Sequence, residues 1–426
     1  MTATRPERIV VINDLSRPLG GASALAIQSA LGFAQLGLCV TFVSGDAPPA
    51  AGLGHPGVAM IGLGQDRLLA RGSIAAAAAG WWNPAAHRMI RQAVIAHDTP
   101  GTVYHLHGWS QILSPAVLGA LAPVRARLVI SAHDFFLVCP NGAFADFASG
   151  TPCPHVPLGI ACCLSGCDRR GRLHKLWRLG RAAIQRAAMP LNACPLVLAI
   201  HPAMRPLLER GGIAPDAIAV VPNPVAPWST TRIAAERNRE VLFVGRIEAT
   251  KGVDLALAAA RMAGVPIRIV GEGSLAADLR TQYPEAHFAG RLAPAAIGRL
   301  ARAARLLVMP SRYPEPFGLV AIEALASGLP VVMPPGALLA GDVAAIGAGA
   351  TVEPRDITAF AAILRDLCTD DGRLAAMSRA AFAHAPSLAM TAQAWLERLL
   401  AIYGARLDQR AIGRALPSMT ARAAEG

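Results

Sequence analysis

Two carboxylates eight positions apart are the side chains of this chain best suited to bind a ligand. Glu315 and Glu323 lie in a block that runs from a proline-rich loop into the apolar helical pattern of residues 319–326. The pattern predicts a helix that starts near Phe317, with Glu315 just before it and Glu323 about two turns inside it. The first free backbone N–H groups, near Phe317 and Gly318, would point outward and attract phosphate.

The neighbours of Glu323 argue against an ordinary solvated carboxylate. Taken alone, either glutamate is best explained as a structural charge, with Glu315 complementing the helix dipole and Glu323 facing solvent. The helix around Glu323 offers almost no polar face, however, since its neighbours are Val320, Ala321, Ile322, Ala324, Leu325 and Ala326. A largely buried carboxylate needs a partner, and a ligand hydroxyl can be that partner.

A second set of candidate ligand-binding residues lies at the start of the second half of the chain. Gly245 and Arg246 end an apolar strand pattern and Lys251 opens the next helix, which places both cations at the sheet edge where ligands bind. Only Lys175 and Lys251 are lysines among the 40 basic residues, so a lysine near a helix start is unusual here. Arg246 can form a fork onto phosphate oxygens, with Lys251 as a compact charge beside it. A surface arginine and an ordinary helix-start lysine are the structural alternative.

Two glycine turns also lie at predicted strand ends. Gly271 and Gly273 follow an apolar strand over residues 266–270, and Gly20 and Gly21 follow the first strand. Glycine at such turns permits close backbone approach to a base, a ribose or a phosphate, but each pair is equally consistent with turn geometry alone.

Three histidines, His105, His107 and His133, lie at or just past strand ends of the first half. A lone histidine is usually structural. Three at the predicted ligand edge of one sheet favour a role for at least one of them, and His133 is the candidate.

Composition predicts an α/β protein with parallel sheets. The 426 residues are 53% hydrophobic and only 5% aromatic, and strand-like runs alternate with alanine-rich helical runs, which excludes all-β and disordered classes. The net charge of +12 favours anionic partners such as nucleotides or phospholipid surfaces. No basic groove interleaved with aromatics is visible, so nucleic acid is not an expected partner.

The order of the apolar runs predicts two doubly wound domains. Residues 1–225 form the first, with a break at the proline-rich segment 222–227, and residues 226–387 form the second. Residues 388–426 are expected to form a helix that packs back across the linker, followed by a mobile basic tail after Leu407. Strands are predicted at Arg8–Ile12, Cys39–Val43, Val103–Leu106, Leu128–Ala132, Leu196–Ile200, Ile218–Val221, Glu240–Gly245, Ile267–Val270, Leu306–Met309 and Val331–Met333.

A cysteine-rich insertion occupies residues 139–167. Its cysteines, which crowd around His155, are Cys139, Cys153, Cys162, Cys163 and Cys167. Zinc could hold such a long loop together, but the spacing lacks paired C-x-x-C motifs, so buried thiols are favoured and no metal site is assigned.

A basic run follows the insertion. Arginines and Lys175 between Arg169 and Arg186 flank Leu173, Leu176 and Trp177. Such a stretch suits an anionic membrane surface, and a solvated helix face is the alternative. Residues 1–15 contain no signal-like segment, the sequence has no long apolar run, and its cysteines do not form a disulfide-like pattern. These features predict a cytoplasmic protein, with peripheral membrane attachment as an option.

The second half resembles the family 4 retaining glycosyltransferases of the GT-B fold. The resemblance rests on Gly245-Arg246 with Lys251, on the G-x-G turn at Gly271 and on Glu315 with Glu323 as an E-x7-E element, all in family order. The first half matches through the Gly20-Gly21 pair, the strand ending at His107 and the His133-Asp134 pair. Pro224 and the cysteine-rich loop depart from the family pattern.

The resemblance implies two facing Rossmann-like domains with a cleft between them and a nucleotide-sugar donor. Arg246 and Lys251 would neutralise the leaving diphosphate, Glu323 would hold the ribose hydroxyls and Glu315 those of the transferred sugar. His133 would line the reaction centre. The remaining donor-binding positions implied are Gly21, Gly245, Gly271, Gly273, Phe317, Gly318 and Leu319.

The resemblance further implies a metal-independent, retaining transfer without a cofactor, to a saccharide or lipid-linked saccharide acceptor. Two other classes stay open at this point. One is a non-catalytic protein that binds nucleotide-sugars. The other is a nicotinamide-dependent oxidoreductase, which is disfavoured because no G-x-G-x-x-G with a downstream acidic residue is present.

Overall fold

The structure, a computed structural model, describes residues 4–422, with side chains up to residue 408. Its contacts divide the chain into two compact units. The N-terminal unit comprises residues up to Gly142, Pro154–Val221 and the residues from Gln393. The C-terminal unit comprises Ala143–Cys153 and Pro222–Ala392.

The N-terminal unit is built on a seven-stranded sheet with the order β3-β2-β1-β4-β5-β8-β9, and each neighbouring pair runs parallel. Its central strands are buried on both faces, which is why they are continuous apolar runs rather than alternating ones. The strands are β1 (Arg8–Asn13), β2 (Cys39–Ser44), β3 (Val58–Gly62), β4 (Thr102–Leu106), β5 (Leu128–Ala132), β8 (Leu196–Ala199) and β9 (Ile218–Val220).

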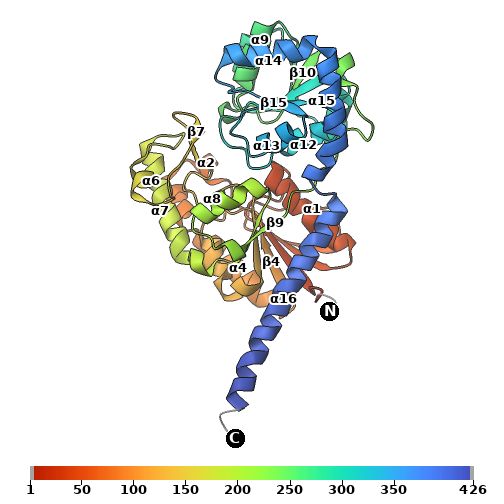
Figure 1. Cartoon of the computed structure of the whole chain (residues 1–426). Coiled ribbons are helices and arrows are strands. Elements are labelled where there is room, and N and C mark those ends of the chain that lie inside the picture. Colours follow the sequence, from red (N-terminus) through yellow and green to blue (C-terminus); the bar gives the residue numbers. More distant parts are fainter. Residues whose placement is uncertain (1–3, 423–426) are drawn as a thin grey trace. The chain divides into compact units, whose positions relative to one another are not determined.

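Helices flank this sheet (Figure 1). They are α1 (Gly21–Gln35), α2 (Leu68–Arg71), α3 (Ile74–Trp81), α4 (Pro84–His97), α5 (Ala116–Leu121), α6 (Ile160–Leu164), α7 (Arg172–Ala188) and α8 (Arg205–Arg210).

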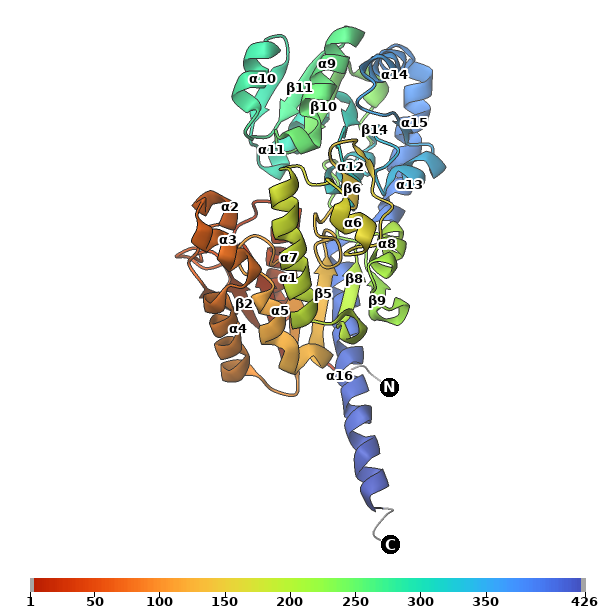
Figure 2. The same ribbon diagram turned by 90° about the vertical axis from the view of Figure 1, so that its left-hand side faces the viewer.

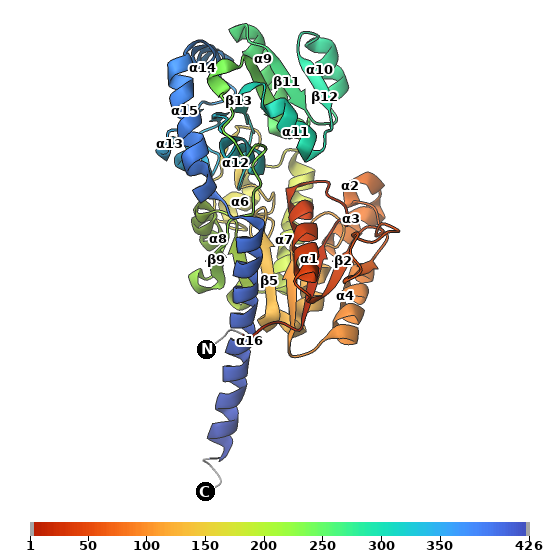
Figure 3. The same ribbon diagram turned by 90° about the vertical axis from the view of Figure 1, so that its right-hand side faces the viewer.

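The long helix α16 (Ala392–Arg422) also belongs to this unit and lies against α1 (Figure 3). Gly32 of α1 allows the contact, because a Cβ there would meet the Leu396 side chain, and the Phe33 and Tyr403 rings lie 5.6 Å apart. The helix continues beyond Leu407 to Arg422, so it is longer than predicted.

The C-terminal unit has a second parallel sheet, of six strands in the order β12-β11-β10-β13-β14-β15. The strands are β10 (Glu240–Val244), β11 (Ile267–Val270), β12 (His287–Gly290), β13 (Ala304–Val308), β14 (Val331–Met333) and β15 (Gly349–Thr351). Its helices are α9 (Val253–Ala263), α10 (Ala276–Gln282), α11 (Pro294–Ala301), α12 (Leu319–Leu325), α13 (Ala340–Ala345), α14 (Ile357–Thr369) and α15 (Asp371–His384). A small hairpin, β6 (Ala145–Asp146) with β7 (Thr151–Pro152), joins this unit by its contacts.

Both sheets reverse their strand order at one place, between β1 and β4 and between β10 and β13. Ligands of doubly wound sheets bind beyond the carboxyl ends of the strands at such a switch point. The predicted α/β doubly wound class is therefore confirmed. The predicted buried strands agree with the structure to within one or two residues. The structure adds the strands β3, β12 and β15, most of whose residues are not buried.

The proline-rich segment is held in place by Met390, two positions before α16 begins. The Val225 N–H donates to the Met390 carbonyl at 3.0 Å, and the Met390 N–H donates to the Asn223 carbonyl at 3.3 Å. Pro224 pairs with Met390 as an isolated bridge, which needs no N–H from the proline.

A fully buried arginine anchors the core of the C-terminal unit. Arg305 of β13 donates to the carbonyls of Glu236 and Asn238 and, through Nε, to that of Leu367 at 2.8 Å. It also pairs with Asp371 at 2.7 Å. The guanidinium thus links three backbone carbonyls from separate segments through one buried group.

Replacing Arg305 by methionine should destabilise the C-terminal unit by about 3–5 kcal/mol, because the apolar side chain fills the space but leaves buried carbonyls without donors. The measurement is urea-induced unfolding. The exposed Arg302→Met is the matched control and should change the unfolding free energy by less than about 0.5 kcal/mol. Equal effects of the two substitutions would contradict this account of the core.

Candidate functional site

The loops that follow β10 and β13 come into close backbone contact at the switch point of the C-terminal sheet. Gly252 has φ +67° and a Cβ there would lie 2.0 Å from the carbonyl oxygen of Pro310. Arg312 strengthens the contact. Its backbone N–H donates to the Thr250 carbonyl at 2.9 Å, and its guanidinium binds the Asp254 carboxylate at 2.6 and 2.8 Å. The two loops therefore form one structure, which carries the predicted site residues.

Lys251 and Glu315 form an ion pair across these loops. Lys251 Nζ lies 2.5 Å from Glu315 Oε1 and 3.1 Å from the Tyr313 hydroxyl, and Ser311 Oγ donates to Glu315 Oε2 at 2.5 Å. Burial alone lowers the pKa of Lys251, but attraction to Glu315 and Tyr313 outweighs it, so the pKa lies above its ordinary value. Burial likewise raises the pKa of Glu315, and Lys251 and Ser311 more than compensate, so it lies below its ordinary value. Both groups are ionised at neutral pH.

Arg246 is near this pair but is not part of it. More than half of its side chain is exposed, and its guanidinium lies 2.9 Å from Glu248. Its charge contributes to the lowered pKa of Glu315, and it partly opposes the rise that burial causes in the pKa of Tyr313. The sequence predicted two neighbouring cations at this edge. In the structure Lys251 is paired with Glu315, whereas Arg246 remains accessible to solvent.

Glu323 has a partner within the protein that the sequence did not reveal. It lies in α12, and its carboxylate accepts a hydrogen bond from the Trp228 side chain. Burial raises the pKa of Glu323 to about 7, against the opposing effect of that hydrogen bond. The neighbours of Glu323 in the sequence correctly indicated a poorly solvated carboxylate, but Trp228 was missed because it lies in a segment without regular structure.

The helix start is two residues later than predicted. α12 begins at Leu319, so the buried Phe317 precedes the helix. Gly318 is its N-cap with φ +70°, a conformation that favours glycine.

The glycines after β11 are required by the fold itself. Gly271 has φ +144° and a Cβ there would lie 1.8 Å from the Gly245 carbonyl oxygen, while a Cβ on Gly273 would lie 2.3 Å from that of Ile247. The close approach is thus to the loop that carries Arg246. Gly20, by contrast, has open space where its Cβ would be, and Gly21 begins α1.

A chain of contacts links the histidines of the N-terminal unit. His107 Nδ1 and His133 Nε2 are 2.9 Å apart, and the His105 and His107 ring centroids are 4.0 Å apart. His105 also hydrogen-bonds to Ser131 Oγ at 2.8 Å and to the Tyr403 hydroxyl at 2.6 Å. Burial lowers the pKa of His105 to about 3 and that of His133 to about 4, so both rings are neutral near pH 7. His133 is therefore held by an extended network that reaches α16.

Sequence reasoning missed a charged cluster beside the histidines. Asp14, directly after β1, accepts backbone N–H groups of Gln111, Ile112 and Leu113 at 2.8–2.9 Å. Arg181 is buried and stabilised by the charges of Asp14 and Asp134, and burial lowers its pKa to about 10. Its Nε and Nη2 atoms have no hydrogen-bond partner among residues 4–422. The position of Asp14 at a strand end, like that of His133, is the signal that could have found it.

The cysteine-rich insertion contains a buried lysine. Lys175 Nζ lies 3.1 Å from Cys167 Sγ and 3.6 Å from Cys162 Sγ, and Asn141 contacts both Cys139 and Cys167. Over the described part of the chain, no group of three or more His, Cys, Asp or Glu side chains is placed to hold a metal ion.

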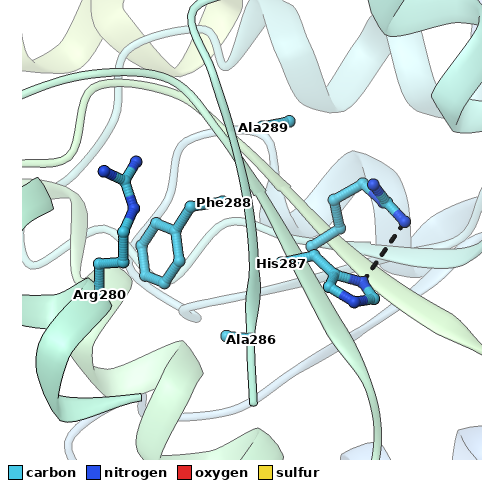
Figure 4. Close-up of a pocket in the computed structure, with 6 residues that line it drawn as sticks. Arg280, Ala286, His287, Phe288 and Ala289 are labelled. Atoms are coloured by element: carbon cyan, nitrogen blue, oxygen red, sulfur yellow. Dashed lines mark hydrogen bonds between the residues drawn. The ribbon is translucent and has the colours of Figure 1, made fainter. Parts of the chain in front are cut away.

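A shallow pocket at strand β12 lies apart from these groups (Figure 4). It is lined by Arg268, Arg280, Ala286, His287, Phe288 and Ala289. His287 begins β12, so this end of the parallel sheet is opposite the carboxyl ends that carry Arg246 and Lys251. Its side chains are already paired, with Glu240 lying 2.6 Å from Arg268 and 3.0 Å from His287.

Two family models match almost the whole chain. Residues 19–228 match the model described as Glycosyltransferase Family 4, and residues 230–384 match the one described as Glycosyl transferases group 1. The chain belongs to the family 4 glycosyltransferases. The oxidoreductase alternative is thereby ruled out, and the predicted GT-B fold agrees with similar solved structures.

The chain is similar to one curated glycosyltransferase in sequence and to two solved structures in fold. D-inositol 3-phosphate glycosyltransferase 1 of Catenulispora acidiphila is 29% identical and covers 96% of this chain and 99% of its own length. Sucrose-phosphate synthase from Thermosynechococcus elongatus has a TM-score of 0.68 at 18% identity, covering 93% of this chain and 98% of that one. HepE from Anabaena, in complex with UDP, has a TM-score of 0.62 at 18% identity, covering 92% and 98%.

Glu323 should make folding stability depend on pH. Its pKa is raised from 4.5 to about 7, so between these values the folded state binds more protons than the unfolded state and stability falls as pH rises. At pH 8, Glu323→Gln should be more stable than the wild type by about 1–3 kcal/mol, after discounting for partial exposure, and at pH 5 the two should be similar. Denaturant unfolding at both pH values measures this.

The exposed Glu272→Gln is the control and should follow the wild type at both pH values. A pH dependence of Glu323→Gln that matches the wild type would show that Glu323 is not held in an unfavourable environment.

Proposed function

We propose that this glycosyltransferase moves a sugar from a nucleotide-sugar, with the diphosphate of the donor bound at Lys251 and Arg246 of the C-terminal unit. The observation that supports this most is the largely buried Lys251–Glu315 pair at the carboxyl ends of the strands. An ammonium has three N–H donors, and Glu315 and Tyr313 take two of them. The third is available for a phosphate oxygen, and the accessible Arg246 supplies a second cation.

The two glutamates take different parts of the donor in this proposal. Glu315 is ionised and oriented by Lys251 and Ser311, and each of its oxygens still has a lone pair with which to accept a sugar hydroxyl. Glu323, with Trp228, accepts the ribose hydroxyls. Because hydroxyls donate to the charged carboxylate, donor binding favours loss of the Glu323 proton and should strengthen between about pH 6 and pH 8.

Charge stabilisation accounts for the chemistry. When the bond between the sugar and the diphosphate breaks, negative charge accumulates on the diphosphate, and fixed cations stabilise it without reorganising. Glu315 is committed to Lys251, which fits a binding role rather than that of a nucleophile. The transfer is proposed to retain the anomeric configuration by attack from the same face, with no cofactor and no metal.

The acceptor belongs with the N-terminal unit in this proposal. His133 and the neighbouring Asp134 and Arg181 form a polar group at the carboxyl ends of its strands. A saccharide or lipid-linked saccharide hydroxyl is proposed to bind there. Burial raises the pKa of Asp134 to about 6, so this carboxyl changes its protonation near neutral pH.

A panel of nucleotide-sugars tests the proposed donor class by thermal stabilisation and by donor hydrolysis. UDP-linked hexoses come first, since HepE was solved with UDP-glucose. Stabilisation without hydrolysis or transfer to any acceptor would favour a protein that only binds nucleotide-sugars. Stabilisation by no nucleotide-sugar would contradict the proposal.

Lys251→Met should lower kcat for donor hydrolysis or transfer by about 10²–10³-fold, because it removes a cation aimed at the developing charge. Steady-state rates on the best donor of the panel measure this. The control is Arg261→Met, which removes an exposed cation from α9 and should leave kcat within about twofold. If the two variants lose activity equally, or neither does, Lys251 does not stabilise the leaving group.

A further inference from the structure

Helix α7 of the N-terminal unit is buried on the side that its sequence makes polar. Lys175, Arg181 and Gln185 are buried, whereas Leu173 is 84% exposed and Leu176 is 61% exposed. A surface helix ordinarily turns its apolar stripe to the core and its charges to water. In α7 the charged ends of Lys175 and Arg181 lie inside, near thiols and carboxylates respectively, whereas Leu173 and Leu176 face solvent.

Helix α6 extends the exposed apolar area. Ile160 and Leu164 are one helical turn apart and are 82% and 81% exposed. The two helices are neighbours, because Lys175 of α7 contacts Cys162 of α6, and Figure 2 shows them side by side. The α6–α7 surface is defined by these four residues: Ile160, Leu164, Leu173 and Leu176. An apolar area of this kind on a soluble unit indicates a binding surface.

Exposed arginines border the α6–α7 surface. Arg169 and Arg170 lie in the connection between the two helices, and Arg172 begins α7, one position before Leu173. The one acidic residue of this connection, Asp168, is buried and binds Arg178 at 2.9 Å and His174 at 3.1 Å. The outward charge beside the leucines is therefore positive.

Trp177 does not belong to the α6–α7 surface, although the sequence grouped it with the apolar residues of the basic run. Its indole N–H donates to the Ala77 carbonyl of α3 at 3.0 Å, and Gly80 leaves room for its ring. The tryptophan anchors α7 to α3, which fixes the direction in which Leu173 and Leu176 point.

We propose that the α6–α7 surface docks the N-terminal unit onto an anionic lipid bilayer. The four apolar side chains would enter the boundary between headgroups and acyl chains, and Arg169, Arg170 and Arg172 would bind lipid phosphates. Three exposed arginines, beside which the one carboxylate of the connection is buried and paired, favour an anionic partner, and an anionic bilayer presents phosphates directly above an apolar layer. Within the described residues no helix has the length and apolarity to cross a membrane.

The inference rests on α6 and α7 alone and does not depend on the proposed donor site. Co-sedimentation of the full chain with vesicles tests it. The wild type should bind vesicles of phosphatidylcholine with phosphatidylglycerol much more strongly than vesicles of phosphatidylcholine alone, and the difference should shrink at high salt.

Two sets of substitutions separate the apolar contribution from the charged one. Leu173→Ser with Leu176→Ser should lower binding to the anionic vesicles at least about tenfold, since apolar burial is lost. Arg169→Ala, Arg170→Ala and Arg172→Ala together should lower it about 100-fold at low salt. The control Ile95→Ser changes a 72% exposed apolar residue of α4 and should bind as the wild type does.

The result that overturns the proposal is an absence of vesicle binding, or binding that the leucine variant retains. Sedimentation velocity adds a further check, because self-association that the leucine variant abolishes, without vesicle binding, would show a protein interface instead. Donor hydrolysis in solution should be unchanged in the leucine variant, so failure of the membrane proposal and failure of the proposed function are distinguishable.

Discussion

The Lys251–Glu315 ion pair is the interaction on which the candidate site depends. A buried ion pair is tolerated only when its remaining donors and acceptors are satisfied, and Ser311 and Tyr313 provide that satisfaction. The pair also needs the two loops to touch, and Gly252 allows the contact with Pro310 that brings them together. β10 and β13 are neighbours in the sheet, so the parallel topology itself delivers both loops to one place.

Much of this arrangement could be predicted because it follows from chain topology. Continuous apolar runs identify buried parallel strands, and residues just after such strands must meet at one edge of the sheet. Gly245, Arg246 and Lys251 were assigned to the site on this ground, and Glu315 and Glu323 from the composition of their segment. The assignment of their roles toward a donor remains a proposal.

What could not be predicted depends on side-chain contacts between distant segments. Trp228 meets Glu323 from an irregular segment, and Tyr403 reaches His105 across almost 300 positions of sequence. Buried cations were equally hidden, because Arg305 and Arg181 look like surface arginines until the carbonyls and carboxylates around them are known. The orientation of helix α7 also could not be predicted from its sequence. Its sequence shows two faces, but only the partners of Lys175 and Trp177 determine which face is outside.

The most direct test of the central claim compares nucleoside and nucleoside diphosphate binding by calorimetry. Uridine and UDP are used first, or the corresponding pair for whichever base the donor screen selects. The wild type should bind the diphosphate at least about 100-fold more tightly than the nucleoside, because Lys251 and Arg246 are proposed to bind the diphosphate alone, and Lys251→Met should lose most of that preference. A diphosphate preference that Lys251→Met keeps in full would contradict the assignment of Lys251 to the donor site.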